Sequence, residues 1–251
     1  MLLVLDIGNT NLVGGVFKGQ KLAFDFRLPT HPLEEGRDYI SGVAQQIRAA
    51  ACKRCVICSV VPALTEIVVQ QVSDVFKLQS LVVDTDVKTG LVLKVDAPAA
   101  VGTDRIVNAA AVRGLWGTPA LVVDFGTATT FDLVDEAGVF QGGIIAPGLG
   151  IGLEALVQRT ARLPSIQLEW PKSVIGKNTI AAMQSGTVLG YVCLVDGLIE
   201  RVIDEFGPVR HIVATGGLGA LIAAHSSRIR HYDLHLTLKG LRLIAALNGW
   251  A

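Results

Sequence analysis

The chain has 251 residues, of which 51% are apolar and 18% charged, and its 22 basic residues balance its 22 acidic ones. This composition excludes a disordered chain, and the balanced charge gives no electrostatic basis for binding nucleic acid or an anionic membrane. The apolar residues 1–5 run straight into Asp6, and no apolar stretch reaches membrane-spanning length. We therefore expect a globular, cytoplasmic protein without a signal peptide.

The hydrophobic pattern predicts an α/β protein, in which short apolar runs form strands and longer segments form helices. In the first half we predict strands at 1–8, 11–17, 21–28, 55–60 and 81–84, and helices at 36–52, after Pro62 and at 103–116. In the second half we predict strands at 120–126, 128–135, 138–146 and 209–214, and helices at 148–158, 177–206, after Gly217 and at 239–248. Each half therefore begins with three strands.

The two halves repeat one another. LLVLDIGNTN at 2–11 matches LVVDFGTATT at 121–130, because each has apolar residues up to an Asp, followed by Gly and small hydroxyl or amide residues. Chance similarity between two buried strands is the alternative, but an Asp that ends an apolar strand before a Gly is uncommon. We interpret the pattern as a duplicated domain whose lobes span 1–117 and 118–251 and face a cleft.

A candidate phosphate site follows the first strand, at Asp6–Asn11. The strand delivers the Asp6 carboxylate to its C-terminal end, and Gly8 permits a tight turn that exposes hydroxyl, amide and backbone N–H groups. Such a turn can hold phosphate oxygens while the carboxylate binds the accompanying cation, although alone it is equally typical of a simple hairpin. Asp124–Thr130 repeats the arrangement, and two such turns would hold a polyphosphate from both sides, as phosphoryl transfer requires.

Two further motifs are compatible with function or with ordinary structure. Thr215–Gly219 follows a strand and opens a helix, so its glycines either let an adenine ring lie against the backbone or simply form a turn. Thr103 is a candidate N-cap, and the helix dipole would then favour Asp104 in the first turn. The functional alternative makes Asp104 a general base and Arg105 an anion clamp. The sequence has no G-x-x-x-x-G-K-[ST] pattern, which excludes a P-loop enzyme.

Cys52, Cys55 and Cys58 have the C-x2-C-x2-C spacing with which a bacterial iron–sulfur motif begins. The motif is incomplete, because no fourth cysteine follows nearby. Cys55 and Cys58 also lie in a predicted strand, where residues three apart face opposite sides. We therefore predict buried, reduced cysteines rather than an iron–sulfur or zinc site.

In their order along the chain, these motifs resemble those of type III pantothenate kinase over essentially the whole length. The matching stretches are DIGNTN at 6–11, SVVP at 59–62, TGL at 89–91, VGTDRIVNAAA at 101–111, DFGTATTFD at 124–132, GGIIAPG at 142–148, NTIAAMQSG at 178–186, TGG at 215–217 and LTLKGLRLIAALN at 236–248. The resemblance implies two ribonuclease-H-like lobes of the actin-like ATPase and sugar-kinase superfamily, with ATP in the cleft. It also implies phosphorylation of pantothenate to 4′-phosphopantothenate, the first step of coenzyme A synthesis.

The resemblance also implies roles for individual residues. Asp104 matches the proton acceptor, Asp124 matches a ligand of a monovalent cation (K+ or NH4+), and Asp6 would steer the Mg2+ that accompanies ATP. The implied ATP-binding residues are Asp6, Ile7, Gly8, Asn9, Thr10, Asn11, Leu12, Val13 and Thr127, and the implied pantothenate-binding residues are Gly102, Thr103, Asp104, Arg105 and Thr179. The resemblance further implies a homodimer in which Thr179 reaches the substrate of the neighbouring chain.

Two positions depart from the resembled pattern. Val95 stands where the family usually has a tyrosine that touches the substrate, which predicts a weaker affinity, and Thr103 replaces the usual alanine. Two alternatives stay open at this point: a kinase of the same superfamily that acts on another small substrate, and a non-catalytic accessory or regulatory relative. Retention of the carboxylates of Asp6, Asp104 and Asp124 favours an enzyme.

Overall fold

The computed structural model describes residues 1–30 and 38–250. The chain divides into two compact units, which we call unit 1 (Met1–Leu115 with His235–Ala251) and unit 2 (Trp116–Leu234). None of the helices in the described ranges is long and apolar enough to cross a membrane.

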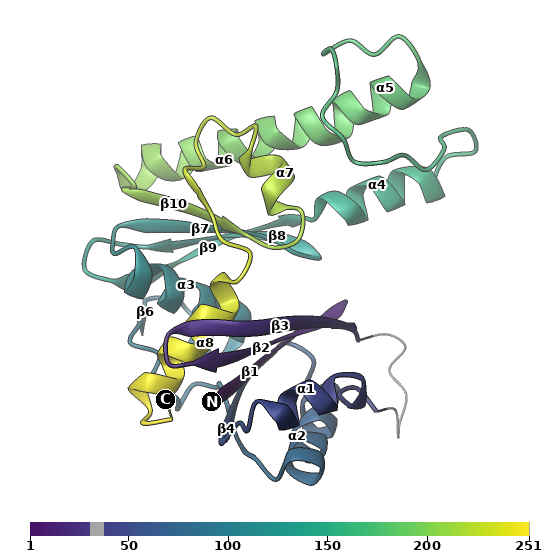
Figure 1. Ribbon diagram of the computed structural model, residues 1–251. Coiled ribbons are helices and arrows are strands. Elements are labelled where there is room, and N and C mark those ends of the chain that lie inside the picture. The colour runs from purple at the N-terminus through teal and green to yellow at the C-terminus, as the bar shows by residue number, and fades with distance from the viewer. Residues whose placement is uncertain (31–37, 251) are drawn as a thin grey trace. The chain divides into compact units, whose positions relative to one another are not determined.

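Unit 1 is built on a five-stranded mixed sheet (Figure 1). Its strands are β1 (Leu2–Ile7), β2 (Asn11–Lys18), β3 (Lys21–Pro29), β4 (Arg54–Ser59) and β5 (Gln79–Val82). They lie in the order β3-β2-β1-β4-β5, with β2 antiparallel to β1 and β3, and β4 parallel to β1 and β5. The central strand β1 is almost entirely apolar because helices cover both faces of the sheet.

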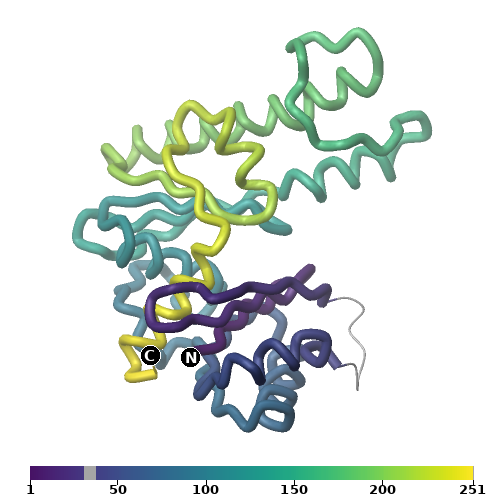
Figure 2. Tube along the Cα trace, in the orientation of Figure 1, coloured from purple at the N-terminus to yellow at the C-terminus, as the bar shows by residue number. Residues whose placement is uncertain are grey.

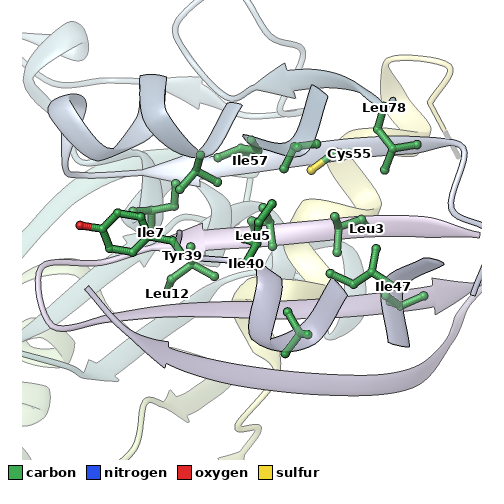
Figure 3. Close-up of a cluster of buried hydrophobic side chains, with 14 of the residues drawn as sticks. Leu3, Leu5, Ile7, Leu12, Tyr39, Ile40, Ile47, Cys55, Ile57 and Leu78 are labelled. Carbon is green, nitrogen blue, oxygen red and sulfur yellow. The ribbon is translucent and has the colours of Figure 1, made fainter. Parts of the chain in front are cut away.

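Helices of unit 1 cover the two faces differently. Its helical elements are η1 (Ser41–Val43), α1 (Ala44–Ala49), α2 (Pro62–Phe76), η2 (Pro98–Ala100), α3 (Thr103–Leu115) and α8 (Leu236–Leu247), and a short strand β6 (Val92–Leu93) precedes η2. On β1, Leu3 and Leu5 point to a core shared with residues of η1, α1 and α2 (Figure 3). Leu2 and Val4 point to the opposite core, which α3 and α8 complete. The helix predicted over 36–52 is observed as η1 and α1, and its residues 36 and 37 lie outside the described ranges.

The C-terminal segment returns to unit 1, which differs from the predicted division into 1–117 and 118–251. The reason is burial: α8 places Leu238, Leu241 and Ile244 in the core beneath β1, all at most 1% exposed. Gly240 permits the close approach of α8 to α3, because a Cβ there would lie 2.5 Å from the carbonyl oxygen of Val107. The two ends of the chain therefore lie in the same unit (Figure 2).

Unit 2 repeats the strand order of unit 1. Its strands are β7 (Ala120–Phe125), β8 (Ala128–Val134), β9 (Val139–Pro147), β10 (His211–Thr215) and β11 (His231–Tyr232). They lie in the order β11-β10-β7-β8-β9, with β8 antiparallel to β7 and β9, and β10 parallel to β7 and β11. This repetition confirms the duplication predicted from the two Asp-containing strands.

Helices of unit 2 pack on the sheet and also extend beyond it. They are α4 (Leu149–Gln158), α5 (Thr179–Gln184), the π-helix η3 (Ser185–Leu189), α6 (Gly190–Phe206) and α7 (Gly219–Ala223). The predicted helix at 177–206 is observed as the uninterrupted run α5–η3–α6, of which α6 buries Val195 and Ile199 against the sheet. Within unit 2, α4, α5 and the segment between them project beyond the strands (Figures 1 and 2). We call residues 149–189 the arm.

Candidate active site

The first candidate phosphate turn joins β1 to β2 in unit 1. Its geometry is tight, because the Gly8 N–H donates to the Asn11 carbonyl at 2.9 Å. Asn9 and Thr10 are exposed at its tip, and Asp6 lies half-buried where β1 ends. The turn therefore presents polar groups at the C-terminal edge of a buried strand, as the sequence predicted.

Some of the predicted nucleotide-binding residues in this turn have buried side chains that cannot contact a ligand. Ile7 and Leu12 are fully buried in the core on the α1 and α2 side of the sheet. Val13 packs against the opposite core. These three apolar positions can therefore offer only backbone atoms to a ligand.

Asp6 and Cys58 share one face of the unit 1 sheet. They are register partners on the parallel strands β1 and β4. Side chains alternate along a strand, and Val4 and Val56 (two residues earlier on each strand) belong to the core beneath α3 and α8. Asp6 and Cys58 therefore face the side on which α3 begins.

The start of α3 is fastened to β4 by Thr103. Its hydroxyl donates to the Ser59 carbonyl at 2.8 Å, and the Cys58 thiol donates to the Thr103 hydroxyl at 3.3 Å. The predicted N-cap role of Thr103 is wrong, because Thr103 is the first residue of α3 itself. Its hydroxyl donates a hydrogen bond to a carbonyl of β4 and does not accept one from a backbone N–H of its own helix. This bond fixes the position of the next residue, Asp104.

Asp104 lies in the first turn of α3, where its carboxylate folds back along the chain. Its Oδ1 accepts from the Arg105 N–H at 2.8 Å. Gly102 leaves the room for this arrangement, because a Cβ at that position would lie 2.5 Å from the same Oδ1. Burial raises the pKa of Asp104, and the Arg105 N–H and guanidinium oppose that rise only in part. The carboxylate is therefore a stronger base than an ordinary aspartate.

Electrostatics indicate that Asp6 and Asp104 surround the same thiol. Burial is the main reason that the pKa of Cys58 lies well above its usual value, and negative charge on Asp6 and on Asp104 raises it further. The structure thus brings together the carboxylates of Asp6 and Asp104, which are 98 positions apart in the sequence. The sequence interpretation missed the place of Cys58 between them, because the register of β1 with β4 is not visible in a local pattern.

The three cysteines diverge, as predicted from their strand. Cys55 lies in the core with Leu3 and Leu5 (Figure 3), whereas Cys58 lies in the opposite core. Cys52 is partly exposed before the strand begins. Within the described part of the chain, no group of three or more His, Cys, Asp or Glu side chains is placed to hold a metal ion.

The second candidate phosphate turn lies in unit 2, between β7 and β8. Asp124 is the register partner of Thr215, so the predicted TGG motif lies beside this turn. Gly216 has a φ of +88°, and a Cβ there would lie 2.7 Å from Asp124 Oδ1 and 2.5 Å from the Phe125 carbonyl oxygen. Glycine is therefore required at 216 both by its backbone conformation and by the close approach of the turn.

Two groups that the sequence interpretation did not single out hold this second turn in place. Gly148 is needed because a Cβ there would lie 2.2 Å from the carbonyl oxygen of Thr127. The Tyr191 hydroxyl, on α6, lies 2.7 Å from the Thr129 hydroxyl and donates to the Pro147 carbonyl at 2.8 Å. The residues around Tyr191 in the sequence do not indicate that it contacts this turn, because the turn lies far away along the chain.

Thr179 lies on the arm, as the first residue of α5. Asn178 caps this helix, because its side chain accepts from the Ala181 N–H at 2.9 Å. Gly176 allows the preceding segment to pack closely against the helix, because a Cβ at this position would lie 2.2 Å from the Ala182 nitrogen. Thr179 borders a cavity of about 680 Å³ that Leu156, Lys177 and Met183 also line. The arm thus holds this threonine in a fixed position beside an open cavity.

Comparison with known proteins identifies close sequence relatives. A family model described as type III pantothenate kinase matches residues 2–201. A type III pantothenate kinase from Brevibacillus brevis is 44% identical over 99% of this chain and 99% of its own length. A type III pantothenate kinase from Moorella thermoacetica is 42% identical over 99% of this chain and 100% of its own length.

Solved structures share the fold at low sequence identity. A protein of the Baf family from Campylobacter jejuni superposes with a TM-score of 0.63 at 21% identity, covering 98% of both chains. The ROK hexokinase from Thermus thermophilus superposes with a TM-score of 0.53 at 15% identity, covering 99% of this chain and 98% of its own. These likenesses confirm the predicted two-lobed, actin-like and sugar-kinase fold.

Proposed function

Because the chain belongs to the type III pantothenate kinase family, we propose that it transfers the γ-phosphate of ATP to pantothenate in the cytoplasm, giving 4′-phosphopantothenate and ADP. The observation that carries this proposal is that Cys58, at the end of β4, lies in register with Asp6 on β1 and donates to the hydroxyl of Thr103, the residue before Asp104. One carboxylate ends the strand that leads into a phosphate-type turn, and the other lies in the first turn of a helix whose start is fastened to β4. Phosphoryl transfer needs such a positioned base next to a phosphate cradle.

In this reaction Asp104 is the general base. It accepts the proton of the primary hydroxyl of pantothenate while the hydroxyl oxygen bonds to the γ-phosphorus and the bond from that phosphorus to the bridging oxygen of ADP breaks. A primary alcohol is too weak an acid to ionise unaided, so proton removal in the transition state is required. The raised pKa of Asp104, caused by burial, suits it to this task because a stronger base drives the transfer better.

The turn between β1 and β2 would bind the ATP phosphates, and Asp6 would bind the divalent cation that accompanies them. Mg2+ prefers oxygen ligands such as carboxylates, and Asp6 supplies one, half-buried at the end of β1 just before the turn. Mg2+ would offset the negative charge that develops on the transferred phosphoryl group. Residues 6–13 would contribute mainly backbone atoms, since Ile7 and Leu12 are buried.

In unit 2, Asp124 would hold a monovalent cation, K+ or NH4+, and Thr127 would contact ATP. The close packing of Gly216 against Asp124 and of Gly148 against Thr127 supports these roles, because it fixes both residues without filling the turn with side chains. A monovalent cation there would contribute positive charge near the phosphates. Next to Asp124, the TGG motif at 215–217 is the candidate adenine site.

Pantothenate would bind at Gly102–Arg105, with Thr179 supplied by the second chain of a homodimer. The arm supports this part of the proposal, because it carries several exposed apolar side chains for which a second copy is a suitable partner. They are Ile151, Leu156, Trp170, Val174, Ile175 and Ile180. Closing the flexible amide of pantothenate between two chains would exclude water and favour transfer over hydrolysis of ATP.

We expect the purified protein to phosphorylate pantothenate with Mg2+ and ATP, faster with K+ or NH4+ than with Na+. A panel of pantothenate, hexoses and acetate, followed by ADP formation in each of the three salts, measures both specificities. Turnover of a hexose or acetate without turnover of pantothenate would support another kinase of the superfamily. Tight ATP binding without any turnover would support a non-catalytic relative.

Substitution Val95→Tyr is expected to lower the KM for pantothenate severalfold without changing the KM for ATP. Val95 is partly buried in the bend before η2, close in sequence to Gly102. A phenolic hydroxyl there would supply one hydrogen bond, on the order of 1 kcal/mol. Initial rates at varied pantothenate and fixed ATP test this expectation, with Val95→Phe as the control that lacks the hydroxyl.

A further inference from the structure

Thr30 is a buried threonine directly after β3, and the residue is 1% exposed. Its hydroxyl and its backbone N–H donate hydrogen bonds to two consecutive carbonyls of the turn between β1 and β2. Its hydroxyl donates to the Asn9 carbonyl at 2.7 Å, and its backbone N–H donates to the Thr10 carbonyl at 3.1 Å. Neither the motif pattern nor the proposed reaction uses this residue.

These two bonds set the orientation of the exposed turn. In a planar trans peptide, the carbonyl of one residue and the N–H of the next point in opposite directions. Because the Asn9 and Thr10 carbonyls both point at Thr30, the N–H groups of Thr10 and Asn11 both point away from it. Consecutive carbonyls of a strand alternate in direction, so this shared direction is a property of the turn that Thr30 stabilises.

Two successive N–H groups that point the same way form a concavity that attracts anions. We propose that Thr30 is a positioning residue that presents the N–H groups of Thr10 and Asn11 to the phosphates of the nucleotide. The inference rests on the proposed binding of ATP phosphates at residues 6–13 and adds the group that orients them. Thr30 itself lies behind the turn and acts through it, so it does not touch the nucleotide.

Substitution Thr30→Val keeps the shape and the backbone bond to Thr10 but removes the bond to Asn9. We expect the Kd of ADP with Mg2+, measured by titration calorimetry without pantothenate, to rise about 5-fold, the typical effect of one lost hydrogen bond. The Kd of adenosine should stay unchanged, because it has no phosphate. In turnover, the KM for ATP should rise in parallel while the KM for pantothenate and kcat hold.

Two variants control for loss of stability. Thr30→Ser keeps the hydroxyl and should restore the affinity for ADP. Thr118→Val removes a hydroxyl that donates to the Glu136 carbonyl at 3.1 Å in unit 2, and should leave the affinity for ADP as it is. An unchanged Kd for ADP in folded Thr30→Val protein, or an equal loss for adenosine and ADP, would overturn the proposal.

A measurement on the unaltered protein covers the case in which Thr30→Val does not fold. Titration of ADP into 15N-labelled protein should move the amide resonances of Thr10 and Asn11 among the most strongly. Saturation with ADP that leaves both resonances in place would overturn the inference. If ADP binds in this way but pantothenate is never phosphorylated, the proposed function fails and the role of Thr30 stands.

Discussion

Substitution of Asp104 by asparagine is expected to lower kcat by about 100- to 10,000-fold, the range that a positioned general base contributes. Asparagine keeps the shape and can still accept the Arg105 N–H, but it cannot take the proton of the substrate hydroxyl. Nucleotide affinity should be retained, because the turn at residues 6–13 is unchanged. Steady-state rates together with calorimetry of ADP measure the two effects separately.

The Asp104→Asn variant also has an expected effect on stability. Burial raises the pKa of Asp104 in the folded chain above its ordinary value of 3.8. In the pH interval between the ordinary pKa and the raised pKa, the folded state therefore binds more protons than the unfolded state. The stability of the wild type relative to the variant should therefore fall as pH rises through the interval, and at pH 7.5 the variant should melt no lower. In the wild type, kcat/KM should rise with pH up to that same raised pKa.

Asp74→Asn is the matched control for this experiment, because Asp74 is exposed on α2 in the same unit. It should change neither kcat nor the pH profile. An Asp104→Asn enzyme that keeps the wild-type rate would contradict the assignment of the base. A variant that melts well below the wild type at pH 7.5 would contradict the view that the partly buried charge of Asp104 costs stability.

Thr179→Arg is expected to abolish turnover, and a mixed dimer is expected to recover it. If Thr179 completes the site of the neighbouring chain, a heterodimer of one Asp104→Asn chain and one Thr179→Arg chain has both lesions in one site. Its other site combines an intact Asp104 with an intact Thr179. The purified heterodimer should therefore turn over at about half the wild-type rate, since one of two equivalent sites is whole.

Each homodimer should be inactive alone, and light scattering should show that both remain dimeric. The interface expected for such a dimer buries on the order of 2,000 Å² or more in total. If every chain builds its own site, both sites of the heterodimer carry one lesion and no rate is recovered. Absence of rescue in a verified heterodimer would thus contradict the shared site.

Much of the fold and of the candidate site could be predicted from local patterns. Asp6 and Asp124 are visible because an apolar strand that ends in Asp before Gly is unusual, and the strand order in the structure repeats around both. Asp104 is visible because it opens a helix whose start matches a specific motif. In each case the information lies within a few residues of the group itself.

The remaining features depend on pairings between distant segments. Cys58 faces Asp6 only through the register of β4 with β1, and Thr30 reaches Asn9 only through the register of β3 with β2. The return of α8 to unit 1 follows from the burial of residues such as Leu241, which would be equally apolar in a helix of unit 2. Such choices are set by packing, and no local pattern carries them.

The most direct test of the proposed function is ADP formation by the purified protein with ATP, Mg2+ and K+, measured with and without pantothenate. We expect ADP to form only when pantothenate is present, with one 4′-phosphopantothenate produced for each ADP and with the rate lost in Asp104→Asn. Equal ADP formation in the presence and absence of pantothenate, or none in either, would contradict the assignment of this chain as a pantothenate kinase.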